Sequence, residues 1–281
     1  MRLAFVVDPL DDLKAYKDSS VAMMREAARR GHEVSAFEAR SMFVRDASVR
    51  CLATPLAIHD DNERWYSPGE PRDARVADYD VVFMRKDPPF DQEYYYATLL
   101  LERAQEEGAR VVNDPRALRD WNEKLAILRF SRFTPPTLVA GEMARLHAFI
   151  DEHQDVVVKK LDGMGGTMIF RVGANDPNRN VIVETITDMG ARTVMAQRFI
   201  PEIASGDKRV LVIAGKPFSH CLARIPKAGE TRGNLAAGGR GVAQPLSGRD
   251  REIAEAVGKE LTVREILDRG TDFDRIAVGE G

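Results

Sequence analysis

The feature that most constrains the fold is a β-branched apolar run that ends in a glycine-rich loop, Val156-Val157-Val158-Lys159-Lys160-Leu161-Asp162-Gly163-Met164-Gly165-Gly166. The run predicts a strand, and its two lysines must point to opposite faces because side chains alternate along a strand. Glycines let a backbone approach a bulky anion, and their N–H groups can form an anion-binding concavity. The loop has neither the Walker pattern nor the dinucleotide-binding pattern of glycines. It predicts either a phosphate-binding loop or an ordinary glycine-rich hairpin.

Length and composition describe a globular chain that can bury a core. The chain has 281 residues, 44% of them hydrophobic and 30% charged, which fits two domains or one large one. Its net charge of −3 argues against nucleic-acid partners. No apolar run approaches the roughly 20 residues that span a membrane, and Asp8 interrupts the first run too early for a signal peptide. Cys51 and Cys221 lack metal-type spacing, so we expect a reduced, cytoplasmic protein.

The first half of the chain has the pattern of a parallel sheet. Strands are predicted over 3–7 and 33–37, with a helix between them that begins at Asp18-Ser19-Ser20 and ends at Arg30. Further strands are predicted over 80–84 and 110–113, and an exposed loop is predicted over 62–71. A helix is predicted over 92–108, with Tyr96, Leu99, Leu100 and Arg103 near one face, and another helix from 115 to about 130. Arg85, Lys86 and Asp87 follow a strand and precede two prolines, which indicates either a ligand-binding edge or a solvated turn.

The second half is antiparallel in style, and the change places a boundary near Pro135-Pro136. Strands are predicted over 137–139, 156–160, 168–172, 193–200, 210–213 and 218–224, and helices over 141–153 and 181–189. The glycine-rich stretch over 225–241 is typical of a functional lid, in which two arginines would contact an anion. Ser247-x-x-Asp250 predicts the start of a helix with Ile253, Val257 and Leu261 in the core, and 271–281 is expected to be a frayed terminus.

Several motifs together resemble the prokaryotic glutathione synthetase family of the ATP-grasp superfamily, over residues 1 to about 261. They are Met84-Arg85-Lys86-Asp87-Pro88-Pro89-Phe90-Asp91, Arg119-Asp120-Trp121-Asn122-Glu123-Lys124-Leu125, Leu161-Asp162-Gly163-Met164-Gly165-Gly166, Gly206-Asp207-Lys208-Arg209-Val210, Cys221-Leu222-Ala223-Arg224-Ile225-Pro226, and the run from Gly229 to Gly241. The resemblance implies a mixed α/β and α+β fold. A pre-ATP-grasp domain with a parallel sheet would cover residues 1–122, and an ATP-grasp domain would cover 123–281.

The resemblance implies ATP-dependent ligation of γ-glutamylcysteine to glycine through an acyl phosphate. This chemistry needs positioned positive charge rather than an enzymic nucleophile, in agreement with the glycine loops, lysines and arginines. The implied nucleotide-site residues are Lys124, Lys159, the loop of Gly163, Met164, Gly165 and Gly166, the adenine hinge of Gln197, Arg198, Phe199 and Ile200, and Asp207. The implied catalytic residues are Arg209 and Arg224. The implied dipeptide contacts are Asp18, Ser19 and Arg85, and the implied lid over 226–241 contains Arg232, Asn234, Gly238, Gly239 and Arg240.

One part of the family pattern is absent. The resemblance implies a later strand with an Asp and another with Glu-x-Asn, which hold Mg²⁺ (Mn²⁺ being possible), followed by a Ser-Pro-Thr turn that helps hold glycine. Here Glu260-Leu261 passes directly to Thr262-Val263-Arg264-Glu265-Ile266. We therefore expect an ATP-grasp domain without its metal-binding strands, with metal ligands unknown and Glu255, Glu260 and Glu265 as the nearest acids. Three functions stay open: a working glutathione synthetase, an impaired nucleotide-binding chain, or another ATP-grasp amino-acid ligase. The resemblance also suggests a homotetramer.

Overall fold

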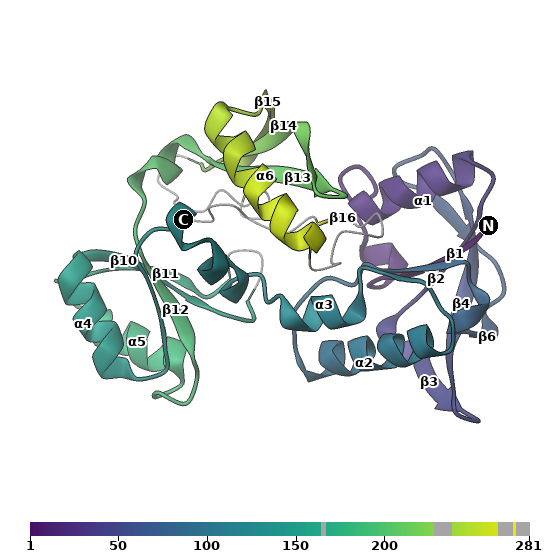
Figure 1. The fold of residues 1–281 in the computed structure, drawn as a ribbon, viewed down its shortest axis with the longest axis horizontal. Helices are drawn as coiled ribbons and strands as arrows, with labels where there is room; N and C mark the ends of the chain where they lie inside the picture. The colour runs from purple at the N-terminus through teal and green to yellow at the C-terminus, as the bar shows by residue number, and fades with distance from the viewer. Residues whose placement is uncertain (164–166, 228–237, 264–271, 274–281) are drawn as a thin grey trace. The chain divides into compact units, whose positions relative to one another are not determined.

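The computed structural model describes residues 1–163, 167–227, 238–263 and 272–273, and it divides into two compact units, Met1–Asp120 and Trp121–Gly281 (Figure 1). No helix within these ranges is long and apolar enough to cross a membrane. Both cysteines, Cys51 and Cys221, are unpaired and buried.

The first unit holds one eight-stranded sheet in the order β3-β4-β2-β1-β7-β8, with β5 and β6 also paired to β4. Its elements are β1 (Arg2–Val6), η1 (Leu10–Asp12), α1 (Ser19–Arg29), β2 (Glu33–Phe37), η2 (Ala39–Ser41), β3 (Met42–Arg45), β4 (Ser48–Ile58), β5 (Tyr66–Pro68), β6 (Arg72–Arg75), η3 (Val76–Asp78), β7 (Val81–Met84), α2 (Gln92–Glu106), β8 (Val111–Val112) and α3 (Pro115–Asp120). Strand β1 pairs in parallel with β2 and β7, which confirms the predicted parallel sheet.

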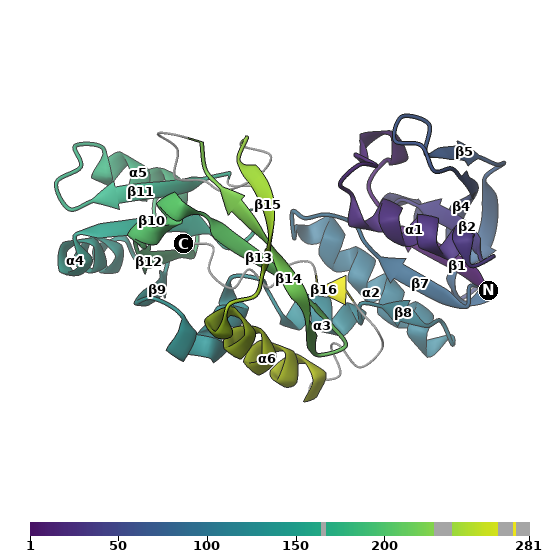
Figure 2. The ribbon, with the colours of Figure 1, turned by 90° about the horizontal axis from the view of Figure 1, so that it is seen from above.

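Helices cover both faces of this sheet, which explains why β1 is continuously apolar. Ala4 and Val6 of β1 share a core with residues of α2, whereas Leu3 and Phe5 share the opposite core with residues of α1. Figure 2 shows α1 lying along the face of β1 and β2. The N-cap of α1 is Asp18, as predicted, and its carboxylate accepts hydrogen bonds from Ser20 N and Val21 N.

The second unit contains two four-stranded sheets, ordered β11-β10-β12-β9 and β15-β14-β13-β16. Its elements are η4 (Leu125–Phe133), β9 (Thr137–Ala140), α4 (Met143–His153), β10 (Asp155–Lys160), β11 (Ile169–Gly173), α5 (Arg179–Thr187), β12 (Val194–Arg198), η5 (Pro201–Ser205), β13 (Asp207–Ile213), β14 (Lys216–Ile225), β15 (Arg240–Pro245), α6 (Gly248–Val263) and β16 (Asp272–Phe273). All strand pairs formed among β9 to β15 are antiparallel, which confirms the predicted change from a parallel to an antiparallel sheet.

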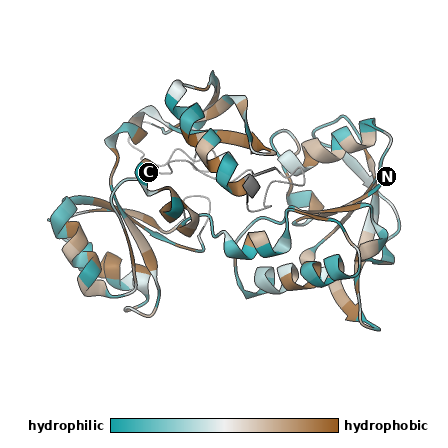
Figure 3. Ribbon diagram, viewed as in Figure 1, coloured by the Kyte–Doolittle hydropathy of each residue, from teal (hydrophilic) through white to brown (hydrophobic). Residues whose placement is uncertain are grey.

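Each sheet of the second unit has a helical layer on one face. Residues of α4 and α5 share a core with Val156 and Val158 of β10. Figure 3 shows hydrophobic residues in the strands of this sheet and hydrophilic residues on α4. Helix α6 contacts β13 and β14 and buries Val257 and Leu261, as predicted. The predicted capping box also forms, since Ser247 Oγ and the carboxylate of Asp250 bond to each other's backbone N–H groups.

Several predicted elements differ from the structure. The helix expected from 115 to 130 ends at Asp120, because Asn122 Oδ1 accepts hydrogen bonds from the N–H groups of Lys124 and Leu125 and starts η4 instead. The loop expected over 62–71 contains β5 and the buried Trp65. Strand β15 begins inside the predicted lid, and β16 lies within the predicted frayed terminus. The buried face of α2 carries Tyr94, Ala97 and Leu101, whereas Tyr96 and Leu99 are exposed.

Candidate active site

The side chain of Lys124 ties the start of the second unit to the glycine loop. Its Nζ donates to the carbonyl oxygen of Gly163 at 2.6 Å and pairs with Glu123 Oε1 at 2.7 Å. Asn122 supports this arrangement, because its Nδ2 donates to the carbonyl oxygen of Leu161 at 3.2 Å. A buried ammonium group therefore lies at the first residue of the loop. The other predicted loop residues, Met164, Gly165 and Gly166, lie outside the described residues.

Lys159 lies on the sheet face opposite α4 and α5. Val156 and Val158 of β10 pack against those helices, so the alternation of the strand sends Lys159 to the other face and Lys160 to the helical one. Lys159 as a whole residue is only 6% exposed. Gln197 shares this face, because it pairs with Val157 across β10 and β12. Two of the predicted nucleotide residues therefore come together on one sheet face.

The predicted hinge over 197–200 uses part of its backbone internally. Arg198 N donates to the carbonyl oxygen of Pro136 at 3.1 Å, and Phe199 N donates to that of Asp155 at 2.9 Å. The N–H of Ile200 has no acceptor among the described residues. The side chain of Gln197 is also engaged, since its Nε2 donates to Thr137 Oγ1 at 2.9 Å. Of the hinge N–H groups, that of Ile200 is the one best suited to a ligand.

Arg171 is a hinge neighbour that the sequence did not point out. Its guanidinium carbon lies 3.7 Å from the ring centroid of Phe199, and the same group holds Asp155 through bonds of 2.6–3.2 Å. The contact depends on the register of β10 with β11, in which Arg171 pairs with Val157. That register could not be read from one arginine in an apolar strand.

Asp207 and Arg224 form a buried ion pair across β13 and β14. Arg224 Nε and Nη2 donate to the two carboxylate oxygens of Asp207 at 2.7 and 2.6 Å, and the two residues are direct partners in the strand register. Gly206 permits this close pairing. It has φ of 104°, and a Cβ there would lie 2.9 Å from the carbonyl oxygen of Arg224.

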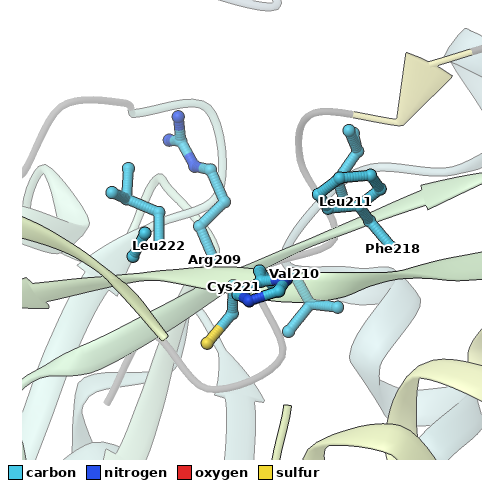
Figure 4. Close-up of a pocket in the computed structure, with 8 residues that line it drawn as sticks. Arg209, Val210, Leu211, Phe218, Cys221 and Leu222 are labelled. Carbon is cyan, nitrogen blue, oxygen red and sulfur yellow. The ribbon is translucent and has the colours of Figure 1, made fainter. Parts of the chain in front are cut away.

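Arg209 projects from the same sheet, two residues beyond Asp207. Figure 4 shows Arg209 and Leu222 on one side of β13 and β14, with the side chains of Val210 and Cys221 on the other side. A pocket of about 310 Å³ lies here. Its lining residues are Arg209, Val210, Leu211, Phe218, His220, Cys221, Leu222 and Ala243. The pocket combines one guanidinium and one imidazole with an apolar surface.

The predicted lid is described only at its ends. Arg240 is the first residue of β15 and pairs with Ile225, so its backbone belongs to a strand rather than to a loop. Gly238 has φ of 88°, and a Cβ there would lie 2.5 Å from the side chain of Lys227. Gly239 lies between Gly238 and Arg240 in the chain. Arg232 and Asn234 lie outside the described residues.

The first unit holds a second group of predicted residues, where β7 ends and α1 begins. Arg85 Nη2 donates to Ser19 Oγ at 2.7 Å, and its Nε donates to Ser20 Oγ at 3.2 Å. Asp18 caps the same helix start through Ser20 N. The structure therefore brings Asp18, Ser19 and Arg85 together at the carboxyl end of a parallel strand, where ligands bind in α/β sheets.

The acids of the described residues do not form a metal centre. No group of three or more His, Cys, Asp or Glu side chains in this part of the chain could hold a metal ion. Glu255 is exposed on α6, and Glu265 lies outside the described residues. Mg²⁺ prefers near-octahedral oxygen ligands, commonly one or two carboxylates with water and substrate phosphates. The described acids therefore supply at most a site of one or two carboxylates of this kind.

Burial is pronounced at four of the charged residues predicted for the site. Four charged residues of the described part are buried as whole residues, namely Lys124, Lys159, Asp207 and Arg224, and outside the site the side chain of Glu107 is also only 9% exposed. All four were predicted for the site from the sequence. Burying a charge is costly unless it is paired and hydrogen-bonded, so such positions are uncommon in a fold without a reason in function.

The chain matches two family descriptions over nearly its whole length. Residues 1–119 match "Prokaryotic glutathione synthetase, N-terminal domain", and residues 123–274 match "Prokaryotic glutathione synthetase, ATP-grasp domain". The glutathione synthetase of Nitrosomonas europaea is 54% identical over 275 residues, which cover 97% of this chain and 86% of that protein.

Solved structures share the fold at low sequence identity. The D-cycloserine synthetase DcsG has a TM-score of 0.63 and 16% identity, with 95% of this chain and 82% of that chain covered. The ATP-grasp ligase PsnB, complexed with minimal precursor, Mg and ADP, has a TM-score of 0.54 and 20% identity, with 94% and 81% covered. These likenesses show the ATP-grasp fold.

Proposed function

The chain belongs to the prokaryotic glutathione synthetase family and is an ATP-dependent ligase by that membership, and we propose that it joins γ-glutamylcysteine to glycine through an acyl phosphate. In this reaction the cysteinyl carboxylate oxygen attacks the γ-phosphorus and ADP leaves. The glycine nitrogen, after its ammonium group has lost one proton, attacks the carbonyl carbon; phosphate leaves and a second proton is released, so that the amide keeps one N–H. The observation that carries the proposal is the coincidence of the four buried charged residues with the predicted site.

Lys124 and Lys159 supply positive charge to the phosphates in this proposal. Both side chains are buried, and that of Lys124 already contacts the loop at Gly163. In such a low-dielectric position a positive charge interacts strongly with a phosphate and needs no rearrangement when charge develops. The N–H of Ile200 would bind adenine, because the neighbouring hinge N–H groups are engaged within the chain.

Arg209 and Arg224 act on the phosphoryl group in transfer. Asp207 fixes Arg224 by the bidentate pair, so we assign it to orienting this arginine at the nucleotide site. Arg209 lies on the same face of β13 as Asp207, and its partner in the strand register is Leu222 of β14. The lid residues Arg232, Asn234, Gly238, Gly239 and Arg240 would exclude water, which would otherwise hydrolyse the acyl phosphate.

Arg85 and Ser19 contact a carboxylate of the dipeptide, with Asp18 holding the helix start. The guanidinium–hydroxyl contact at 2.7 Å puts a fixed donor group where β7 ends. Planar guanidinium groups match carboxylates in geometry, which favours this role over that of a solvated turn.

The divalent metal is the incomplete part of the site. An ATP-grasp domain implies a divalent metal, Mg²⁺ or Mn²⁺, which neutralises phosphate charge when bound. The family's Asp and Glu-x-Asn ligands are absent from the sequence, and the described residues hold no group of three or more His, Cys, Asp or Glu side chains that could hold a metal ion. This observation favours a second candidate function, a nucleotide-binding chain with severely impaired turnover.

Phosphate release from ATP with γ-glutamylcysteine, measured with and without glycine and over a Mg²⁺ and Mn²⁺ series, separates the two functions. Glycine-dependent release at the rate of the full-length Nitrosomonas europaea relative would rule out the impaired chain. Phosphate release without glutathione formation, or none at all despite nucleotide binding, would rule out the working ligase. Insertion, after Leu261, of the two metal-binding strands that the family pattern implies should then restore activity, and no gain would contradict the deletion argument.

The remaining assignments follow the family. We propose a cytoplasmic homotetramer whose partners are the two small substrates, without a nucleic-acid or membrane partner. Light scattering of the purified chain tests the tetramer, and a monomer at micromolar concentration would contradict it.

A further inference from the structure

Asp8 connects the ends of two neighbouring strands in the first unit. It follows β1, which pairs in parallel with β7 so that Val6 lies beside Met84. One carboxylate oxygen of Asp8 accepts from Lys86 Nζ at 2.9 Å, and the other accepts from Asp87 N at 2.8 Å. Asp8 thus holds the turn after β7 both through a side chain and through the backbone.

The turn that Asp8 holds carries Arg85. The N–H of Arg85 donates to the carbonyl oxygen of Val6 at 2.8 Å, which is the last backbone bond between the two strands. The next backbone anchor along the turn is the bond from Asp87 N to Asp8. Lys86 is therefore the single residue between two fixed points, and Arg85 cannot shift without breaking one of them.

We propose that Asp8 is a positioning residue for dipeptide binding, which rests on the proposed contact of Arg85 and Ser19 with the dipeptide. Asp8 does not contact the guanidinium itself. It fixes the backbone of the turn, so that the guanidinium stays against Ser19 Oγ at 2.7 Å and Ser20 Oγ at 3.2 Å. A guanidinium held in place loses less conformational freedom when it binds a carboxylate.

The backbone bond to Asp87, rather than the ion pair with Lys86, carries this effect. Lys86 Nζ also donates to the carbonyl oxygen of Asp87 at 3.0 Å, so the ion pair reaches the main chain only through a flexible side chain, and its two side chains are 24% and 29% exposed. The bond to Asp87 N is a charge-assisted bond to the main chain at a turn that two prolines restrict further.

The test compares four variants by steady-state kinetics. Asp8→Ala should raise the KM for γ-glutamylcysteine by about tenfold, the usual effect of one lost hydrogen bond to a charged group, with kcat and the KM for ATP within about twofold. Asp8→Asn keeps an acceptor for Asp87 N and should recover most of the affinity. Lys86→Met should stay within about twofold of the wild type. Asp11→Ala is the matched control, because it removes a 2.7 Å bond from Tyr66 O–H nearby without touching the turn.

The outcomes separate this inference from the proposed function. An equal loss in both KM values, or a lower melting temperature with unchanged KM, would show that Asp8 is only structural. If the wild type forms no glutathione, the proposed function fails, and calorimetric titration with γ-glutamylcysteine becomes the readout. Weaker binding by Asp8→Ala than by wild type and Asp11→Ala then supports the inference. Equal binding, or no binding by the wild type, overturns it.

Discussion

Arg224 and Asp207 face each other across two antiparallel strands and share two hydrogen bonds of 2.7 and 2.6 Å, with both side chains almost wholly buried. This relationship joins a structural requirement to a functional one. The carboxylate lowers the cost of keeping the guanidinium out of water, and the same contact helps to set the direction of the guanidinium.

We expect Asp207→Ala to lower the free energy of unfolding by about 3–5 kcal/mol, because it removes the carboxylate and both of its hydrogen bonds from a buried guanidinium. Asp155→Ala is the control, since its pair with Arg171 is 39–46% exposed and should cost less than about 1 kcal/mol. Urea denaturation measures both. Equal losses in the two variants would contradict the prediction.

The double variant Asp207→Leu with Arg224→Met should regain most of the stability lost by Asp207→Ala, because two apolar side chains replace the pair. It should form no glutathione, since the proposed phosphoryl-stabilising cation is gone. Denaturation and glutathione formation on the same preparation test this pair of outcomes, and an active double variant would remove Arg224 from the proposed site.

Lys159 and Lys160 offer an internal comparison of neighbouring lysines. Lys159→Met should raise the KM for ATP by about tenfold or more, because a buried charged contact to phosphate is lost. Lys160→Met should stay within about twofold, since Lys160 points to the helical face. The two variants are compared by measuring turnover or nucleotide binding over a series of ATP concentrations. A larger effect of Lys160→Met would show that Lys160, rather than Lys159, contacts the nucleotide.

Helix α6 sits very close to the turn between β13 and β14. A Cβ on Gly258 would lie 2.4 Å from the carbonyl oxygen of Gly215, so Gly258→Ala should destabilise the fold by about 1–3 kcal/mol despite its better helix propensity. Gly248→Ala in the same helix is the control, because nothing lies within 4 Å of its Cβ. Thermal unfolding measures both, and a neutral Gly258→Ala would show that the helix can move away.

Asp250 makes the start of α6 sensitive to pH. Burial pushes the pKa of Asp250 upward, but hydrogen bonds from Lys208 and Ser247 outweigh it and hold the pKa below its ordinary value. A lowered pKa in the folded state adds stability above the unfolded-state pKa of about 4, and this stability disappears as pH falls through the folded-state value.

Asp250→Asn should therefore be less stable than the wild type at pH 7, with a difference that shrinks below about pH 4. Urea unfolding at pH 7, 5, 4 and 3 measures the difference. Asp120→Asn is the control, since it removes an exposed carboxylate 3.8 Å from Arg116 and should show little difference at any pH. A constant gap for Asp250→Asn down to pH 3 would contradict the linkage.

Local sequence patterns predicted most elements because each pattern has one physical solution. The continuous apolar run at β1 required cover on both faces, and Asp18 and Asp250 marked helix starts through their capping bonds. The misses occurred where a side chain or a neighbour decided the outcome. Asn122 ended a helix that propensity would have continued, and β15 formed from a stretch with glycine and proline because β14 offered an edge.

The site shows the same division. Glycine and lysine motifs located the buried cations, because such residues are rare inside a fold without a ligand. Their partners could not be predicted, since they depend on register between distant strands. The pairing of Asp207 with Arg224 needs the β13–β14 hairpin, and the contact of Asp8 with Asp87 needs β1 beside β7. Pair contacts of this kind belong to tertiary structure.

The two buried cysteines have a consequence for the chemistry around the chain. Burial raises the pKa of Cys51 to about 12 and also raises the pKa of Cys221. Thiol–disulfide exchange requires a thiolate that can reach its partner, and the raised pKa values keep both sulfurs protonated at neutral pH. Cys51 is also wholly buried, whereas Cys221 lines the pocket beside Arg209. A catalyst that works among the thiols it assembles thereby keeps its own two sulfurs in the form that exchanges poorly with them.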